Sequence, residues 1–302
     1  MATEFYQYKN FNFNDFDLVV KDGVLYAVYV KKFSYPKNNK GAKRPNRFSL
    51  AKSGDGKNWE EVGDILFPRK NTWEESLWAG AILKECNYYT LYYTGVTKLK
   101  EASTKVGKAY SKDLIHWKKD PGNPVLVFDS KNPYYSDEPL FCFRDPYPII
   151  INNKKYVLVA TKDKSKSDCK RGCIGIVRRV RKNKFNWMPP IFSPGKYPVL
   201  ECPALYKIKN RWYLFYGDDK KAVFRYAVAN EPFGPFREPK NNILLPKLNY
   251  NVKIVRFKGR ILLYHWYRDF PGGFVRERLA YPKEIKMLKG GEIRLKTNLK
   301  IR

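Results

Sequence analysis

Five short segments of the 302-residue chain combine aromatic and β-branched residues, and each opens near a glycine or asparagine turn. Within them, apolar residues alternate with polar ones or run together over the length of one strand, which is typical of hairpin strands. Helical periodicity is nearly absent, and 20 prolines and 19 glycines interrupt the chain. The five segments span residues 22–30, 86–95, 153–163, 210–219 and 258–269.

A second element follows each of the first four segments and consists of a strand end, a polar turn and an aromatic residue. These aromatic residues are Trp59, Trp117, Trp187 and Phe236. The segments recur at intervals of about 50–65 residues, the repeat scale of a propeller blade. We therefore predict an all-β fold, a five-bladed β-propeller with four-stranded antiparallel blades, in which these four residues pack beneath the outer strands.

The rest of the composition indicates a single domain without a membrane span. No shift in composition marks a linker, so residues 1–302 are expected to form one propeller domain. No run of about 18 apolar residues occurs, which predicts no transmembrane helix and no membrane partner. The first residues lack a basic segment followed by an apolar one, so we expect no signal peptide and a cytoplasmic protein.

Cysteine and histidine usage points away from disulfides and metals. The five cysteines form no dense framework, which fits a reducing compartment. The only histidines, His116 and His265, do not lie at zinc-finger spacing from Cys169 and Cys173. No metal site is therefore predicted.

The chain is strongly basic, with 59 Lys and Arg against 29 Asp and Glu and a net charge of +30. Lysine-rich runs at residues 31–47 and 162–172 could attract nucleic acid, an anionic surface or an acidic glycan. These runs fall between the apolar segments, and no nucleic-acid motif accompanies them. We interpret them as solvated loops and expect no specific nucleic-acid partner.

Acidic residues interrupt three of the segments that precede the aromatic strands. Asp15 and Asp17 stand two residues apart, a spacing that places both on one face of a regular strand. Arg144 and Asp145 break an aromatic and apolar run, and Glu201 stands alone in another. Their positions predict the innermost strands of the first, third and fourth blades, which converge on the propeller axis.

Three carboxylates that point at one axis repel one another. Taken singly, each has a plain structural interpretation as a local ion pair, a turn cap or the partner of a buried lysine. Their shared register within three repeats favours an active site, where such costly clusters are tolerated because they share a proton, pair with Arg144 or bind a ligand.

These acidic motifs resemble the three signature motifs of glycoside hydrolase family 32, whose members act on β-fructofuranosides. The motifs are Asn-Asp-Phe-Asp at residues 14–17, Phe-Arg-Asp-Pro at 143–146 and Glu-Cys-Pro at 201–203. The resemblance extends over about residues 12–273. Families 43 and 68 belong to the same superfamily of five-bladed furanosidases. The β-sandwich that typically follows the propeller in family 32 is not expected here.

The resemblance implies a role for each matched residue. Asp15 corresponds to the nucleophile and Glu201 to the acid/base. Asp145 corresponds to the carboxylate that holds sugar hydroxyls and stabilises the transition state, and Arg144 to its charged partner. An apolar neighbourhood and nearby carboxylates are expected to raise the pKa of Glu201 and so keep its proton available. Hydrolysis by paired carboxylates needs no cofactor, and the expected partner is a carbohydrate substrate.

The sequence departs from the family pattern at two places. Phe16 and Asp17 replace the family's proline and asparagine, so Asp17 is an alternative nucleophile and a substrate-binding candidate. Residues 78–81, Trp-Ala-Gly-Ala, replace Phe-Ser-Gly-Ser. An inverting mechanism like that of family 43, acting on arabinose or xylose units, stays open, as does a non-catalytic basic propeller that binds glycan. Further pocket candidates are Trp73, Trp78 and His265, together with Trp266.

Overall fold

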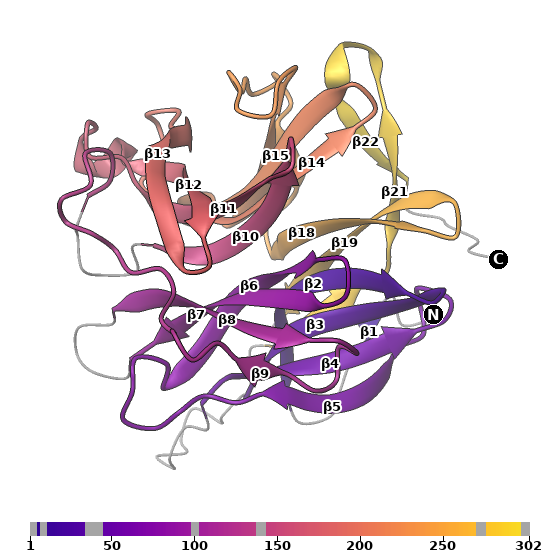
Figure 1. Ribbon diagram of the computed structural model, residues 1–302. Helices are drawn as coiled ribbons and strands as arrows, with labels where there is room; N and C mark the ends of the chain where they lie inside the picture. Colours follow the sequence, from indigo (N-terminus) through magenta and orange to yellow (C-terminus); the bar gives the residue numbers. More distant parts are fainter. Residues whose placement is uncertain are drawn as a thin grey trace.

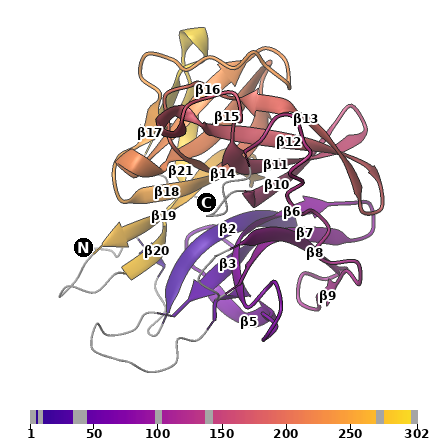
Figure 2. The ribbon, with the colours of Figure 1, turned by 90° about the vertical axis from the view of Figure 1, so that its left-hand side faces the viewer.

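The computed structural model describes residues 5–6, 11–33, 45–97, 103–136, 143–269 and 276–296. Five antiparallel sheets surround a common axis, which confirms the predicted five-bladed β-propeller (Figure 1). The ribbon turned by 90° shows the third and fourth blades above the first and second (Figure 2). Among the described residues, no helix has the length and apolar character needed to cross a membrane.

The first four blades each contain four strands that pair in chain order. The first two blades comprise β2 (Asn12–Lys21), β3 (Val24–Lys32), β4 (Arg47–Ser53) and β5 (Glu60–Leu66), then β6 (Ser76–Lys84), β7 (Tyr89–Val96), β8 (Thr104–Ser111) and β9 (Lys118–Lys119). The next two comprise β10 (Arg144–Ile151), β11 (Lys154–Lys162), β12 (Gly172–Arg181) and β13 (Lys184–Phe192), then β14 (Leu200–Ile208), β15 (Arg211–Asp218), β16 (Val223–Ala229) and β17 (Ile243–Leu245). Short 3₁₀ turns lie at Asp168–Lys170, Asp219–Lys221 and Lys289–Gly291.

The fifth blade has six strands rather than the four predicted. They are β18 (Asn249–Phe257), β19 (Arg260–Asp269), β20 (Arg276–Ala280), β21 (Lys283–Met287), β22 (Ile293–Lys296) and the N-terminal β1 (Phe5–Tyr6). The outer edge of β19 is divided, because one end pairs with β20 and the other with β21. β1 pairs with β20, so the beginning of the chain completes the last blade and closes the ring.

The five aromatic segments form the second strand of each blade, namely β3, β7, β11, β15 and β19. Every residue of β7 is buried, because second strands are covered by neighbouring blades on both faces. The four aromatic residues after these segments are partly buried and pack against the core, as predicted. Trp59 contacts Tyr264 edge-on at 6.0 Å between ring centroids, and Trp187 lies 5.0 Å from Phe143.

Each inner strand carries a β-bulge near its N-terminal end. The pairing register shifts between Asn14 and Phe16, Trp78 and Gly80, Arg144 and Tyr147, Glu201 and Ala204, and Tyr250 and Lys253. A bulge removes a residue from the ladder and redirects its side chain, and bulges are common beside active sites. Asp145, Cys202 and Asn251 adopt positive φ angles of 56°, 47° and 50°. All five inner strands therefore bend at the same level of the propeller.

Candidate active site

A cavity of about 390 Å³ opens at the end of the axis where the inner strands begin. Its volume lies within the range of ligand pockets. All five bulged strands contribute to its wall. The lining includes six of the residues selected from sequence, Asp15, Trp78, Arg144, Asp145, Glu201 and Trp266, with Lys32, Cys202, Asp219, Tyr250 and Arg268 among the others.

Asp15 occupies the bulge of β2 and projects into this cavity. Its Oδ1 accepts hydrogen bonds from Asn251 Nδ2 at 3.1 Å and Trp266 Nε1 at 3.2 Å, both from the fifth blade. Burial is the main cause that raises the pKa of Asp15, and the negative charge of Glu201 adds to it. The Trp266 hydrogen bond acts in the opposite direction. The carboxylate is thus held in place by two donors and remains accessible from the pocket.

Asp145 lies in the bulge of β10 and is anchored through its backbone and its side chain. Its amide donates to Thr94 Oγ1 at 2.9 Å, and its Oδ2 accepts from the Cys202 amide at 3.0 Å. The pKa of Asp145 is raised to about 7. Burial is the largest cause; the positive charge of Arg144 opposes it, and the negative charges of Glu201 and Asp15 add to it. The second, third and fourth blades thus meet at this carboxylate.

Glu201 has polar partners on both carboxylate oxygens. Arg144 donates to Oε1 at 2.5 Å, and the Tyr250 hydroxyl donates to Oε2 at 2.6 Å. The expectation of an apolar neighbourhood, drawn from the flanking residues, is wrong. The bulge of β14 turns the carboxylate into the cavity, whereas its apolar sequence neighbours Leu200 and Ala204 are buried between blades.

The Cys202 thiol lies between two of the carboxylates. Its sulfur is 3.6 Å from Asp15 Oδ1 and 3.7 Å from Asp145 Oδ2. Burial, followed by the charges of these carboxylates and of Glu201, raises the pKa of Cys202 well above its usual range. The thiol is therefore protonated at neutral pH and can donate a weak hydrogen bond to one carboxylate, which eases their mutual repulsion.

Asp17 does not share the direction of Asp15. The bulge between Asn14 and Phe16 breaks the alternation, and Asp17 Oδ2 instead accepts a hydrogen bond from the Ile82 amide of β6 at 2.7 Å. Its side chain is buried, with the positive charge of Lys253 from the fifth blade acting on it, and does not line the cavity. This placement corrects its assignment as a substrate-binding residue and argues against the alternative nucleophile.

Two further sequence candidates also lie outside the cavity. Trp73 stacks on Tyr93 at 6.0 Å between ring centroids with an interplanar angle of 17°, and thus packs within the second blade. His265 is 1% exposed, and burial lowers its pKa to about 3, so it is a neutral core residue. Alternation along the strands could not distinguish these aromatic side chains from pocket residues.

Sequence reasoning missed Tyr250 and Asn251, which hold Glu201 and Asp15. They stand just before the fifth aromatic segment, at the position that the acidic motifs take in their own blades. A search of all five inner strands for polar and aromatic residues, rather than for acidic residues alone, would have found them. Lys32 and Arg268 line the cavity and were missed as well; both pair with the buried Glu277, at 3.7 and 2.6 Å.

Asp145→Asn is expected to stabilise the fold more above neutral pH than below it. Because the folded-state pKa of Asp145 is raised from 3.8 to about 7, folding favours the protonated carboxyl. That contribution is complete below the unfolded pKa and is lost as the pH rises through the folded one. The uncharged amide escapes this loss. As the pH rises from 3.8 to about 7, the free energy of unfolding of the variant minus that of the wild type should therefore grow by roughly 1–4 kcal/mol.

Urea unfolding at several pH values measures this difference. Glu60→Gln is a suitable control, because the Glu60 side chain is 71% exposed and should show no comparable trend. A difference between Asp145→Asn and wild type that stays constant with pH would contradict the prediction.

A comparison with protein families finds one match that covers most of the chain. The model of the glycosyl hydrolases family 32 N-terminal domain matches residues 7–252. No curated protein sequence matches the chain.

Solved structures with the same architecture include members of two families. Fructan 1-exohydrolase IIa from Cichorium intybus gives a TM-score of 0.73 at 18% identity, over 96% of this chain and 59% of that one. The Bombyx mori GH32 beta-fructofuranosidase gives 0.70 at 17% identity, over 95% of this chain and 64% of that one. A thermostable family-43 glycoside hydrolase gives a TM-score of 0.72 at 16% identity, over 95% of this chain and 94% of that one. At these identities, the likeness shows the shared fold.

Proposed function

The chain belongs to glycosyl hydrolase family 32, and from this premise we propose that it is a furanosidase that cleaves the glycosidic bond of a fructose-containing substrate. One observation carries the proposal. The carboxylates Asp15, Asp145 and Glu201 come from three blades and line one cavity. Two carboxylates flanking a sugar are sufficient for glycosidic hydrolysis.

We propose a double displacement. Glu201 gives its proton to the leaving oxygen while Asp15 attacks the anomeric carbon and forms a covalent glycosyl-enzyme intermediate. Glu201 then takes a proton from water, which attacks the same carbon and releases Asp15. Arg144 and Tyr250 orient the two oxygens of Glu201. Asp145 accepts hydrogen bonds from sugar hydroxyls, and its negative charge stabilises the oxocarbenium-like transition state.

A second enzymatic candidate is an inverting furanosidase of the family 43 type. Its support is the loss of two hydroxyls at residues 78–81, where Trp-Ala-Gly-Ala replaces Phe-Ser-Gly-Ser, beside a fold that the family-43 structure shares over 95% of this chain. The chain spans 59% and 64% of the two family 32 structures. In that mechanism Asp15 activates water instead of attacking the sugar. A non-catalytic glycan-binding propeller is the less favoured candidate, because binding alone does not require three carboxylates.

A hydrolysis screen tests the proposed function. The protein is incubated with sucrose, inulin-type and levan-type fructans, and aryl β-fructofuranosides, beside aryl arabinofuranosides and xylosides. Release of fructose supports the proposal. Turnover of only the arabinosides or xylosides supports the family 43 alternative, and the absence of turnover on all substrates overturns both.

Proton NMR of the first-formed product is expected to show the substrate's own anomeric configuration. Asp15 as nucleophile requires the carboxyls of Asp15 and Glu201 to lie about 5–5.5 Å apart, whereas an intervening water requires about 6.5–9.5 Å. We predict the shorter separation, because the Asn14-Asp15 and Glu201-Cys202-Pro203 motifs match the retaining family. A product that first forms with the opposite configuration refutes the double displacement.

A further inference from the structure

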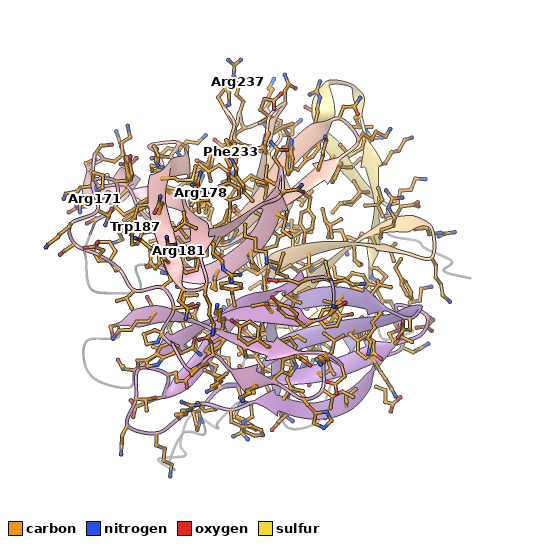
Figure 3. All side chains as sticks on the ribbon, in the orientation of Figure 1. Arg171, Arg178, Arg181, Trp187, Phe233 and Arg237 are labelled. Carbon is orange, nitrogen blue, oxygen red and sulfur yellow. The ribbon has the colours of Figure 1, made fainter. Side chains whose placement is uncertain are left out.

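The propeller face opposite the candidate active site carries a basic groove. The inner strands begin at the active site, so the hairpins that join β6 to β7 and β10 to β11 lie at the far end of the axis. Two depressions, of about 750 and 460 Å³, lie beside these hairpins and share Arg179 and Lys182. The larger depression lies between the second and third blades, whereas third-blade residues alone line the smaller one, including Arg178 and Arg181 of strand β12 (Figure 3). We call the two depressions together the basic groove.

Positive charge dominates this basic groove. Its seven cationic side chains are Lys112, Lys154, Lys155, Arg178, Arg179, Arg181 and Lys182. Glu85 pairs with Lys155 at 2.6 Å and lies 3.9 Å from Arg179. Within the described part of the chain, the other five have no carboxylate within ion-pairing distance.

One further acid, Asp113, lines the basic groove, and another, Asp120, lies beneath it. Asp113 bonds His116 at 2.7 Å and caps its own turn. Beneath the groove, the buried Lys108 pairs with Asp120 at 3.3 Å. The seven cations outnumber the two acids beside them, Glu85 and Asp113, and a cluster of this kind concentrates anions from solution.

Two tyrosines contribute an aromatic wall to the basic groove. The Tyr88 hydroxyl donates to Glu85 at 2.5 Å, and the Tyr110 hydroxyl donates to Asp120 at 2.6 Å. Their ring centroids lie 5.8 Å apart at an interplanar angle of 75°. Both rings are partly exposed and fixed in orientation, so the groove combines cations with a rigid apolar surface.

We propose that the basic groove binds an acidic polysaccharide, with Arg178, Arg181 and Lys182 contacting its carboxylates or sulfates and the tyrosine wall contacting its sugar rings. Because the two depressions meet at Arg179 and Lys182, a ligand can extend from one into the other, which suits an extended chain rather than a single anion. The choice of a glycan rests on the proposed function, whereas the preference for an anion rests on the groove itself. Nucleic acid is disfavoured, because the perpendicular tyrosines offer no parallel platform for successive bases.

Binding of polygalacturonate to the full-length protein tests this proposal. The triple variant Arg178→Ala/Arg181→Ala/Lys182→Ala removes three unpaired cations from the groove. It is expected to weaken binding by at least about tenfold and to reduce the salt dependence of the affinity. The matched control, Arg237→Ala/Lys240→Ala/Lys247→Ala, removes the same charge from exposed positions on the fourth blade and should weaken binding less than about twofold.

Two further ligands distinguish binding of an acidic polysaccharide from binding of a neutral glycan or of nucleic acid. Neutral dextran should not bind, and an oligothymidylate with the same number of charges should bind more weakly than polygalacturonate. Equal losses in the two triple variants, binding of dextran, or tighter binding of the oligothymidylate would overturn the proposal.

Hydrolysis of a small furanoside should be unchanged in the groove variant. A protein that binds polygalacturonate through this groove but hydrolyses no furanoside would refute the proposed function and leave the groove assignment standing.

Discussion

Asp15→Asn is expected to abolish hydrolysis, with kcat lower by roughly 10⁴-fold or more. The amide keeps the size of the carboxylate, and its oxygen can still accept from Asn251 and Trp266, which hold Oδ1 at 3.1 and 3.2 Å. It cannot attack the anomeric carbon, and it carries no charge to stabilise a developing cation. Steady-state kinetics on an aryl furanoside, with folding checked by circular dichroism, measures the effect.

Asp17→Asn is the matched control for Asp15→Asn, because the same chemical change is made two residues along the same strand. Asp17 bonds the Ile82 amide and does not line the cavity, so this variant should lose stability rather than turnover. If instead Asp17→Asn is inactive and Asp15→Asn is active, the nucleophile is misassigned. For Asp15→Ala, recovery of turnover on addition of azide would identify a missing nucleophile directly.

Glu201→Gln is expected to lower kcat by roughly 10²–10⁴-fold on a substrate with a poor leaving group, because glutamine has no proton to give to the leaving oxygen. The amide retains the shape that fits between Arg144 and Tyr250. The loss should be much smaller for an activated aryl furanoside, whose leaving group hardly needs protonation. Rates measured on sucrose and on a nitrophenyl furanoside would show this divergence.

Glu231→Gln provides the control for Glu201→Gln, because Glu231 lies on the same blade and is exposed. It should leave both rates unchanged. Full activity of Glu201→Gln on sucrose, or an equal loss on both substrates, would exclude Glu201 as the general acid of the first step.

The number of blades and the strands nearest the axis followed from local sequence. Each second strand is buried on both faces, so it must be a continuous aromatic and β-branched run such as residues 89–96. The inner strand comes directly before that run, and this order placed Asp145 and Glu201 at the axis. The fifth blade was only partly predictable, because β1 joins β20 from the opposite end of the chain.

The sequence by itself thus determined the five-fold repeat, the all-β architecture and the three acidic strands, because these depend on patterns within a few tens of residues. The tertiary structure alone decided which side chains meet. Alternation predicts direction only in a regular ladder, and the bulge of β2 sends Asp15 into the cavity and Asp17 towards β6. Glu201 accepts hydrogen bonds from Arg144 and Tyr250, which belong to neighbouring blades and lie 57 and 49 residues away along the chain. Such partners depend on how blades close around the axis, which no local pattern records.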